Sequence, residues 1–328
     1  MFNLIEELLG GELSQTALYP LIMFLGSLIS PAELSEDAKF KLYEGTMNSI
    51  VASLRASGQR ASYDEIKINK SSDSIDTSNF KVSIPISYFN DNDEICVANN
   101  QDEFKQFPSS EDQIKACFIN LSIKSISLKN LSLKKPTEKN LIFEMSGIEF
   151  DLNAITNIQS DNAAGINLVL GVITENNKIN ADYYAESGYN FNTDTSTANT
   201  KIGIKNLINF EYEVVGSNTT FKDDFVTFDL NKFKFVIEDL GARKLAEYFA
   251  LSTLGTKFSS ELVSSFEPKN ESQKNKLEEV KKFLDGANKI ECKRENSIYI
   301  DTEVLINNFL IFDFLFLLDQ LCEDLKTS

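Results

Sequence analysis

The chain has 328 residues, with 32 basic and 49 acidic side chains, and so carries a formal net charge of −17. It contains no histidine and no tryptophan. Without histidine, Ser-His-Asp catalysis, imidazole proton switches and histidine-ligated metal sites are excluded. Binding to nucleic acid depends on lysine and arginine neutralising phosphate charge, so this acidic balance disfavours general nucleic-acid binding.

Residues 1–62 are predicted to form an N-terminal helical region. Phe2–Leu9 and Leu13–Ile29 have helical patterns, and the second is apolar nearly all round. Ser30 followed by Pro31 and Glu33 is typical of a helix N-terminus, and the apolar spacing beyond it predicts a helix over 31–57. The apolar residues of the second helix either pack on the sheet or contact a protein partner or a lipid. The candidates for such contacts are Leu21, Ile22, Phe24 and Leu25. No segment has the roughly 18–20 uninterrupted apolar residues that a membrane span needs.

Residues 63–238 are predicted to form a central antiparallel sheet. Phe80, Val82 and Ile84 alternate with polar residues, and Pro85 favours an edge position for that strand. The alternation changes phase between later runs and again at Gly147, as β-bulges would cause. The apolar run 202–214 is predicted to be one strand, separated from its predecessor by the polar stretch 192–200. No helical pattern interrupts this region, so a doubly wound parallel sheet and its nucleotide crevice are excluded.

Residues 239–328 are predicted to be a C-terminal helical region. A helix, or two in series, is expected over Thr302–Leu325 because its centre is apolar on most of its circumference. The candidate interaction residues in it are Phe309, Phe312, Phe314 and Phe316. Arg243 and Lys244 follow a glycine at a helix start, where they would either bind an anion or face solvent.

The four cysteines fall into one pair in the first half of the chain and one pair near its end. Cys96 and Cys117 flank a polar stretch, where a disulfide would contribute roughly 3 kcal/mol. A second bridge between Cys292, in a predicted strand, and Cys322 would pin the last helix. Two disulfides imply an oxidising compartment, and four free thiols would instead imply the cytoplasm.

Three segments resemble AsmA-like and uncharacterised alphaproteobacterial cell-envelope proteins. They are the strand pair Ala61–Ile68 with Phe80–Ile84, the stretch 202–216, and the strand-to-helix junction Phe228–Gly241 that leads into Lys244–Ala246. The resemblance implies a long, curved antiparallel sheet in the cell envelope, with roles in lipid handling or envelope structure. It carries over no site residues. The expected fold class is therefore α+β, with a long curved antiparallel β-sheet flanked by N-terminal and C-terminal helices.

These observations leave three hypotheses for the function. The first is a non-enzymatic binding or structural module of the bacterial periplasm or envelope, in its mature form after signal removal, that docks with protein partners as an accessory subunit. The second is a lipid-binding or lipid-transfer protein that uses an apolar groove of the sheet. The third is a carboxylate-based hydrolase, which would need a cleft with two carboxyl groups about 5–10 Å apart. No catalytic residue, cofactor or metal site is predicted.

Overall fold

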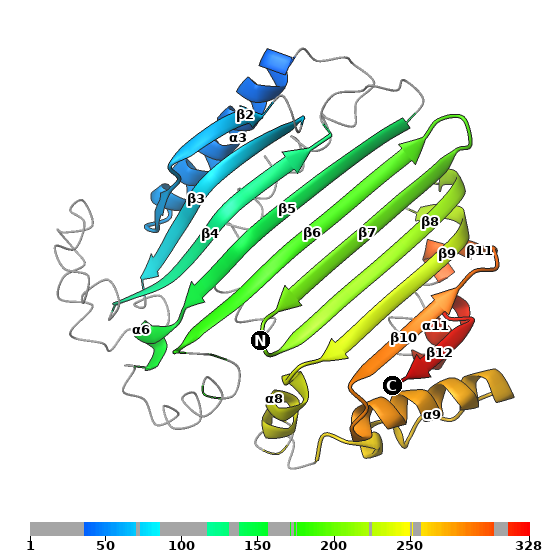
Figure 1. Ribbon diagram of the computed structural model, residues 1–328. Helices are drawn as coiled ribbons and strands as arrows, with labels where there is room; N and C mark the ends of the chain where they lie inside the picture. Colours follow the sequence, from blue (N-terminus) through cyan, green and yellow to red (C-terminus); the bar gives the residue numbers. More distant parts are fainter. Residues whose placement is uncertain are drawn as a thin grey trace. The chain divides into compact units, whose positions relative to one another are not determined.

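The computed structural model describes residues 36–69, 73–85, 117–130, 138–156, 171, 174, 176–222, 225–249, 251, 257–304 and 314–328. These residues form an α+β chain built on a long twelve-stranded antiparallel sheet (Figure 1), which confirms the predicted fold class. The strand order is β1-β3-β4-β5-β6-β7-β8-β9-β10-β12, with β2 pairing beside β3 and β11 beside β9.

The strands are β1 (Arg60–Ser62), β2 (Glu65–Asn69), β3 (Ser74–Pro85), β4 (Phe118–Lys129), β5 (Glu138–Asp151), β6 (Lys178–Asn190), β7 (Thr195–Ile204), β8 (Ile208–Lys222), β9 (Phe225–Asp239), β10 (Lys289–Arg294), β11 (Ile298–Asp301) and β12 (Asp324–Thr327). The helices are α3 (Glu36–Ala56), α6 (Asn153–Thr156), α8 (Ala242–Phe249), the 3₁₀ helix η3 (Ser260–Val263), α9 (Glu271–Asp285) and α11 (Phe314–Leu321).

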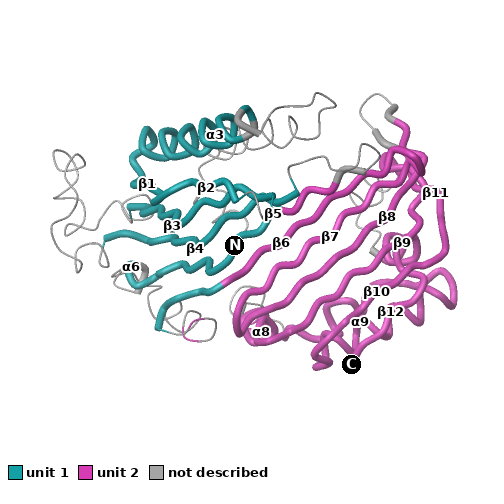
Figure 2. Tube along the Cα trace, turned by 45° about the horizontal axis from the view of Figure 1, so that its top comes forward, with its two compact units in different colours: residues 1–132, 143–170, 175–180 teal, residues 133–142, 171–174, 181–328 magenta. Residues whose placement is uncertain are grey.

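The chain divides into two compact units (Figure 2). Unit 1 comprises residues 1–132, 143–170 and 175–180, and unit 2 comprises residues 133–142, 171–174 and 181–328. Among the described residues, no helix combines the length and the apolar character that crossing a membrane requires.

In unit 1, α3 lies along one face of β1, β2, β3 and β4 (Figure 2). Its buried residues recur every three or four positions, the spacing of one helix face, and they are Tyr43, Met47, Val51 and Leu54. The Tyr43 hydroxyl lies 2.8 Å from Oγ1 of Thr77 on β3, a buried hydrogen bond that joins the helix to the sheet. The described part of the predicted helix 31–57 is thus an amphipathic helix that ends at Ala56.

The phase changes predicted on β4 and at Gly147 of β5 lie beside a further phase change on β3, which was not predicted. On β3 the buried side chains switch from odd to even positions around Asn79, which has a positive φ of 51°. On β4 the buried side chains switch from odd positions before Lys124 to even positions after it. A Cβ on Gly147 of β5 would come within 2.9 Å of the Lys124 Cβ. Gly147 has a φ of 60°, so both its backbone and its surroundings require glycine. β3 is not an edge strand as predicted, because β1 and β2 lie on one side of it and β4 on the other. Pro85 is tolerated because it ends β3 beyond the last residue that pairs with β1.

Unit 2 contains the hairpins β6–β7 and β7–β8, followed by β9. The structure corrects two predictions here. Most of the polar stretch 192–200 is strand, since β7 begins at Thr195. The threonines in it are β-branched, and β-branched residues favour strands. The predicted single strand 202–214 is the end of β7 and the start of β8, separated by a turn in which Asn206 has a φ of 61°.

A C-terminal layer completes unit 2. Helices α9 and α11 pack on β10 and β12 around a core of buried residues: Val263, Leu277, Val280, Ile290, Cys292, Leu315, Leu318, Cys322 and Leu325. The predicted helix Thr302–Leu325 is wrong at its end. α11 stops at Leu321, and Leu325 lies in β12 opposite Cys292. Long-range pairing with β10 therefore overrides the local helical pattern.

Candidate functional site

The two faces of β6, β7 and β8 differ in chemistry. On one face the side chains are mostly apolar or aromatic and half-buried, and we call the nine residues of this face the open face: Tyr183, Ala185, Ser187, Ala198, Thr200, Ile202, Phe210, Tyr212 and Val214. Antiparallel register sets them in rows across the strands. Tyr183 lies opposite Ile202, which lies opposite Phe210, and Thr200 lies opposite Tyr212. Such cross-strand neighbours have Cβ atoms about 5 Å apart, so the rows form one continuous surface.

The open face continues directly into the C-terminal core. Phe210 lies opposite Ile237 of β9, and Tyr212 lies opposite Phe235. Phe235 and Ile237 pack against the core under α9 and α11, whereas the residues of β6, β7 and β8 stay half-exposed. With strands about 4.8 Å apart and residues of one face about 6.8 Å apart along a strand, nine residues on three strands cover about 300 Å². Patches of this size on single chains are often functional.

A small polar cluster lies within the open face. Thr200 is only 6% exposed, beneath the tyrosines of the neighbouring strands. Burial raises the pKa of Tyr183, the nearby Tyr212 raises it further, and the hydrogen bond with Thr200 offsets part of this rise. Tyr183 therefore remains protonated at physiological pH and offers a hydroxyl group within an apolar surface.

The opposite face of the same strands carries a ladder of alternating charges. Lys201 on β7 and Lys234 on β9 each lie 3.6 Å from the Glu211 carboxylate on β8. The ladder extends to β10, where Lys293 lies 3.0 Å from Glu291. Burial raises the pKa of Glu291, but the lysines around it outweigh that effect and lower the pKa overall. The lysines and glutamates of this ladder are thus paired with one another.

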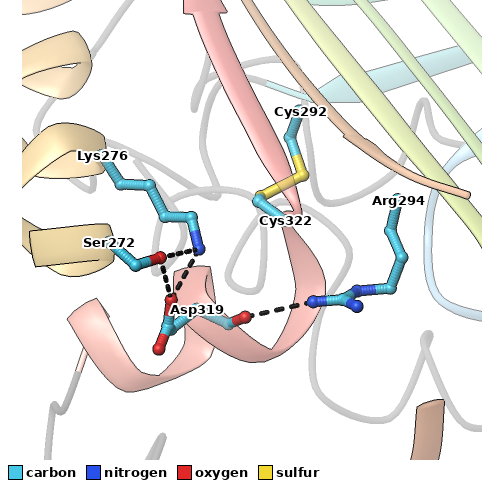
Figure 3. The surroundings of a disulfide bond; sticks show 6 residues. All are labelled: Ser272, Lys276, Cys292, Arg294, Asp319 and Cys322. Carbon is cyan, nitrogen blue, oxygen red and sulfur yellow. Dashed lines mark hydrogen bonds and ion pairs between the residues drawn. A yellow bond between two sulfur atoms is a disulfide. The ribbon is translucent and has the colours of Figure 1, made fainter. Parts of the chain in front are cut away.

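A disulfide anchors the C-terminal layer (Figure 3). Cys292 on β10 and Cys322 after α11 are bonded with Cα atoms 5.3 Å apart, and both are fully buried. This confirms the predicted Cys292–Cys322 bridge. A disulfide in such a core is typical of proteins that fold in an oxidising compartment.

A buried ion pair supports the disulfide from the side of α9. Lys276 is 6% exposed, and its Nζ lies 2.6 Å from Oδ1 of Asp319 and 3.0 Å from Oγ of Ser272 (Figure 3). Burial raises the pKa of Asp319, but the hydrogen bonds from Lys276 and Ser272 outweigh it, so the net shift lowers the pKa. Arg294 donates from NH2 to the Asp319 backbone oxygen at 3.2 Å. These contacts fix α11 against α9 and β10, and they have a structural role.

Arg243 also has a structural role, and both predictions made for it are wrong. Its NH2 group donates to the backbone oxygens of Phe283 at 2.7 Å and Ala287 at 2.6 Å, at the C-terminal end of α9. A cation at that end satisfies carbonyl groups and complements the helix dipole. The Asp239 carboxylate accepts hydrogen bonds from the backbone nitrogens of Gly241 and Arg243, which caps α8. Lys244 is exposed, as one of the two alternatives expected.

Unit 1 contains an open polar pocket of about 460 Å³. It is lined by Glu65, Lys67, Ile68, Asn69, Asp76, Thr77, Ser78 and Ser125. The two carboxyl groups in it already have partners: Glu65 accepts from Lys67 at 2.5 Å, and Asp76 accepts from Ser74 at 2.9 Å and from Ser127. Within the described part of the chain, no group of three or more cysteine and carboxylate side chains is placed to hold a metal ion.

Most of the predicted interaction residues lie outside the described residues. These are Leu21, Ile22, Phe24, Leu25, Phe309 and Phe312, together with Cys96. Phe314 is the first residue of α11, and Phe316 is half-buried in the same helix. Cys117 is disulfide-bonded. The structure thus brings together one predicted cysteine pair and leaves the predicted aromatic clusters untested.

Sequence reasoning missed the open face, although its signal was present. Ile202 and Phe210 were both recognised as apolar strand residues, but a single strand over 202–214 hides the fact that they face each other in a hairpin. The signal is the Lys205-Asn206 pair between two alternating runs, because asparagine tolerates the positive φ of a tight turn.

No protein-family model matches the chain, and a search of the curated proteins found no match. Its function is therefore inferred from its own surfaces.

Proposed function

We propose that the protein is a non-enzymatic binding module of the cell envelope that docks an amphipathic segment of a protein partner on the open face. The observation that carries this proposal is the contrast between the two faces of β6, β7 and β8. One face carries a ladder of ion pairs, and the other presents half-exposed aromatic rings beside a covered core.

The size of the open face favours a narrow partner. Its area of about 300 Å² is less than half of the roughly 800 Å² that each protein contributes to a stable interface of standard size. A single helix or strand with one apolar face fits such an area, as in other peptide-binding surfaces. The tyrosine hydroxyls add hydrogen-bonding groups of the kind that peptide backbones and polar side chains use.

The compartment is part of the proposal. A fully buried disulfide supports an oxidising environment, and the bacterial periplasm is the one that the resemblance to AsmA-like envelope proteins implies. A role as an accessory subunit follows if the docked segment belongs to a larger assembly.

Site-specific photo-crosslinking tests the docking. A photoreactive residue replaces Ala198, on the middle strand of the open face, or Lys201 on the opposite face of the same strand. The envelope fraction is then irradiated and analysed by mass spectrometry. We expect a protein adduct from position 198 and none from position 201. The double variant Ile202→Ser/Phe210→Ser should lose the adduct.

The matched control is Val215→Ser/Val236→Ser, which makes the same apolar-to-polar change on the opposite face of β8 and β9 and should retain the adduct. Circular dichroism shows that each variant is folded. A lipid adduct at position 198, together with co-purified lipid in native mass spectrometry, would replace the proposal by the lipid-binding alternative. Equal protein adducts from both faces would refute the docking role of the open face.

A further inference from the structure

Strand β2 in unit 1 presents a sheet edge and a pocket at the same place. Among the described strands β2 pairs with β3 alone, so its other side is an edge of the sheet. Four of its five residues are exposed, and the Lys67 side chain is 67% exposed. An edge strand offers backbone N–H and C=O groups that can pair with another extended chain.

The pocket beside this edge is suited to a cation. Its lining combines the carboxylates of Glu65 and Asp76 with the hydroxyl of Ser78 and the hydroxyl of Ser125. Lys67 is the one basic residue among them, so acceptors predominate. A lysine or arginine from outside would compete with Lys67 for Glu65 and would bring a positive charge to Asp76, which among the described residues accepts hydrogen bonds only from serine hydroxyls. Bonds between such a cation and a carboxylate are strong charge-assisted hydrogen bonds.

The remaining side chains of β2 fit an alternating partner. Ile66 and Ile68 point to the other side of the strand from Glu65 and Lys67, and Ile68 is 38% exposed. A strand added next to β2 would therefore place apolar side chains beside the isoleucines and polar ones beside the pocket. A second copy of this chain fits poorly, because antiparallel self-pairing centred on β2 sets Lys67 opposite Lys67 of the copy.

We propose that β2 is a docking edge for an extended segment of a partner protein, which adds a strand to the sheet and inserts a lysine or arginine into the pocket formed by Glu65 and Asp76. This surface is separate from the open face of unit 2. The backbone pairing provides affinity, and the pocket selects the basic side chain.

The test uses the full oxidised chain and labelled nine-residue peptides of alternating valine and threonine, with a central threonine replaced by arginine, norleucine or glutamate. Fluorescence anisotropy measures binding, and hydrogen exchange locates it. We expect the arginine peptide to bind best, to protect the amides of 65–69, and to lose binding when its alternate backbone nitrogens are methylated.

The Glu65→Gln variant should bind the arginine peptide about fivefold more weakly, the upper range for a partly exposed ion pair, and should bind the norleucine peptide as before. Glu278→Gln, an exposed carboxylate of unit 2, is the matched control and should change neither affinity. The proposal is overturned if no peptide binds at millimolar concentration, if the glutamate peptide binds equally well, or if methylation has no effect. Concentration-dependent dimers that protect 65–69 without peptide would also overturn it.

Discussion

Reduction of the Cys292–Cys322 disulfide is expected to lower the free energy of unfolding of the C-terminal layer by about 3.6 kcal/mol. The two cysteines are 30 residues apart in sequence. Opening a loop of that length returns about 12 cal mol⁻¹ K⁻¹ of conformational entropy to the unfolded chain, which gives this value at 25 °C. Both cysteines are fully buried, so a reductant reaches them only when the layer opens.

The chain has no tryptophan, so urea unfolding is best followed by circular dichroism together with hydrogen exchange of peptides from 271–294 and 314–328. Each curve is measured with and without a phosphine reductant present throughout, and mass spectrometry confirms complete reduction. The variant Cys292→Ala/Cys322→Ala is the control, and its 314–328 peptides should no longer respond to the reductant. If fully reduced wild-type protein keeps the same urea midpoint in the 314–328 peptides, the disulfide is not what holds α11 and β12 in place.

Three further perturbations test other parts of the structure by urea unfolding. Burial raises the pKa of Tyr43 to about 12. The stability that the protonated Tyr43 contributes is therefore present below the unfolded pKa near 10 and is lost as the pH rises toward 12. Tyr43→Phe should remove this alkaline loss of stability and should lower the free energy of unfolding by about 1 kcal/mol at neutral pH. Gly241→Ala should destabilise the protein by about 1–3 kcal/mol, because φ is 156° and an added Cβ would overlap the backbone oxygen of Asn206. Gly203→Ala is the comparison: its added Cβ meets only a side chain, so it should cost less. Glu211→Gln breaks two cross-strand ion pairs, so it should cost less than about 1 kcal/mol, and a loss that persists in 1 M salt would contradict the electrostatic explanation.

Local patterns predicted the strands of the central sheet where apolar and polar residues alternate. The alternation at Phe80 and Val82 correctly located β3, and the phase change at Gly147 coincides with a positive φ at that residue. Prediction failed where tertiary pairing decides the structure. Thr195–Thr200 has a turn-like composition, but it is strand because β6 and β8 pair with it on both sides.

The candidate site was harder to predict than the fold, for a physical reason. A docking surface on a sheet is defined by which residues share a face across strands, and that depends on register. One misplaced turn at Asn206 was enough to hide the open face. The disulfide was easier, because two cysteines near the end of the chain limit the possible partners. The role of Arg243 could not be predicted, because the carbonyl groups it binds are at the end of a helix about 40 residues further along the chain.

The net charge of −17 bears on which partners the two proposed surfaces attract. On the ladder face of unit 2, lysines such as Lys201, Lys234 and Lys293 are already paired with glutamates in the sheet. Because structural ion pairs occupy these lysines, the excess acidic charge remains for interactions with other molecules, and it attracts basic partners over long range. The open face calls for a partner with an apolar stripe, and the pocket beside β2 calls for a partner with a lysine or arginine. The two surfaces can be tested separately, because crosslinking at position 198 and peptide binding at 65–69 report on different units.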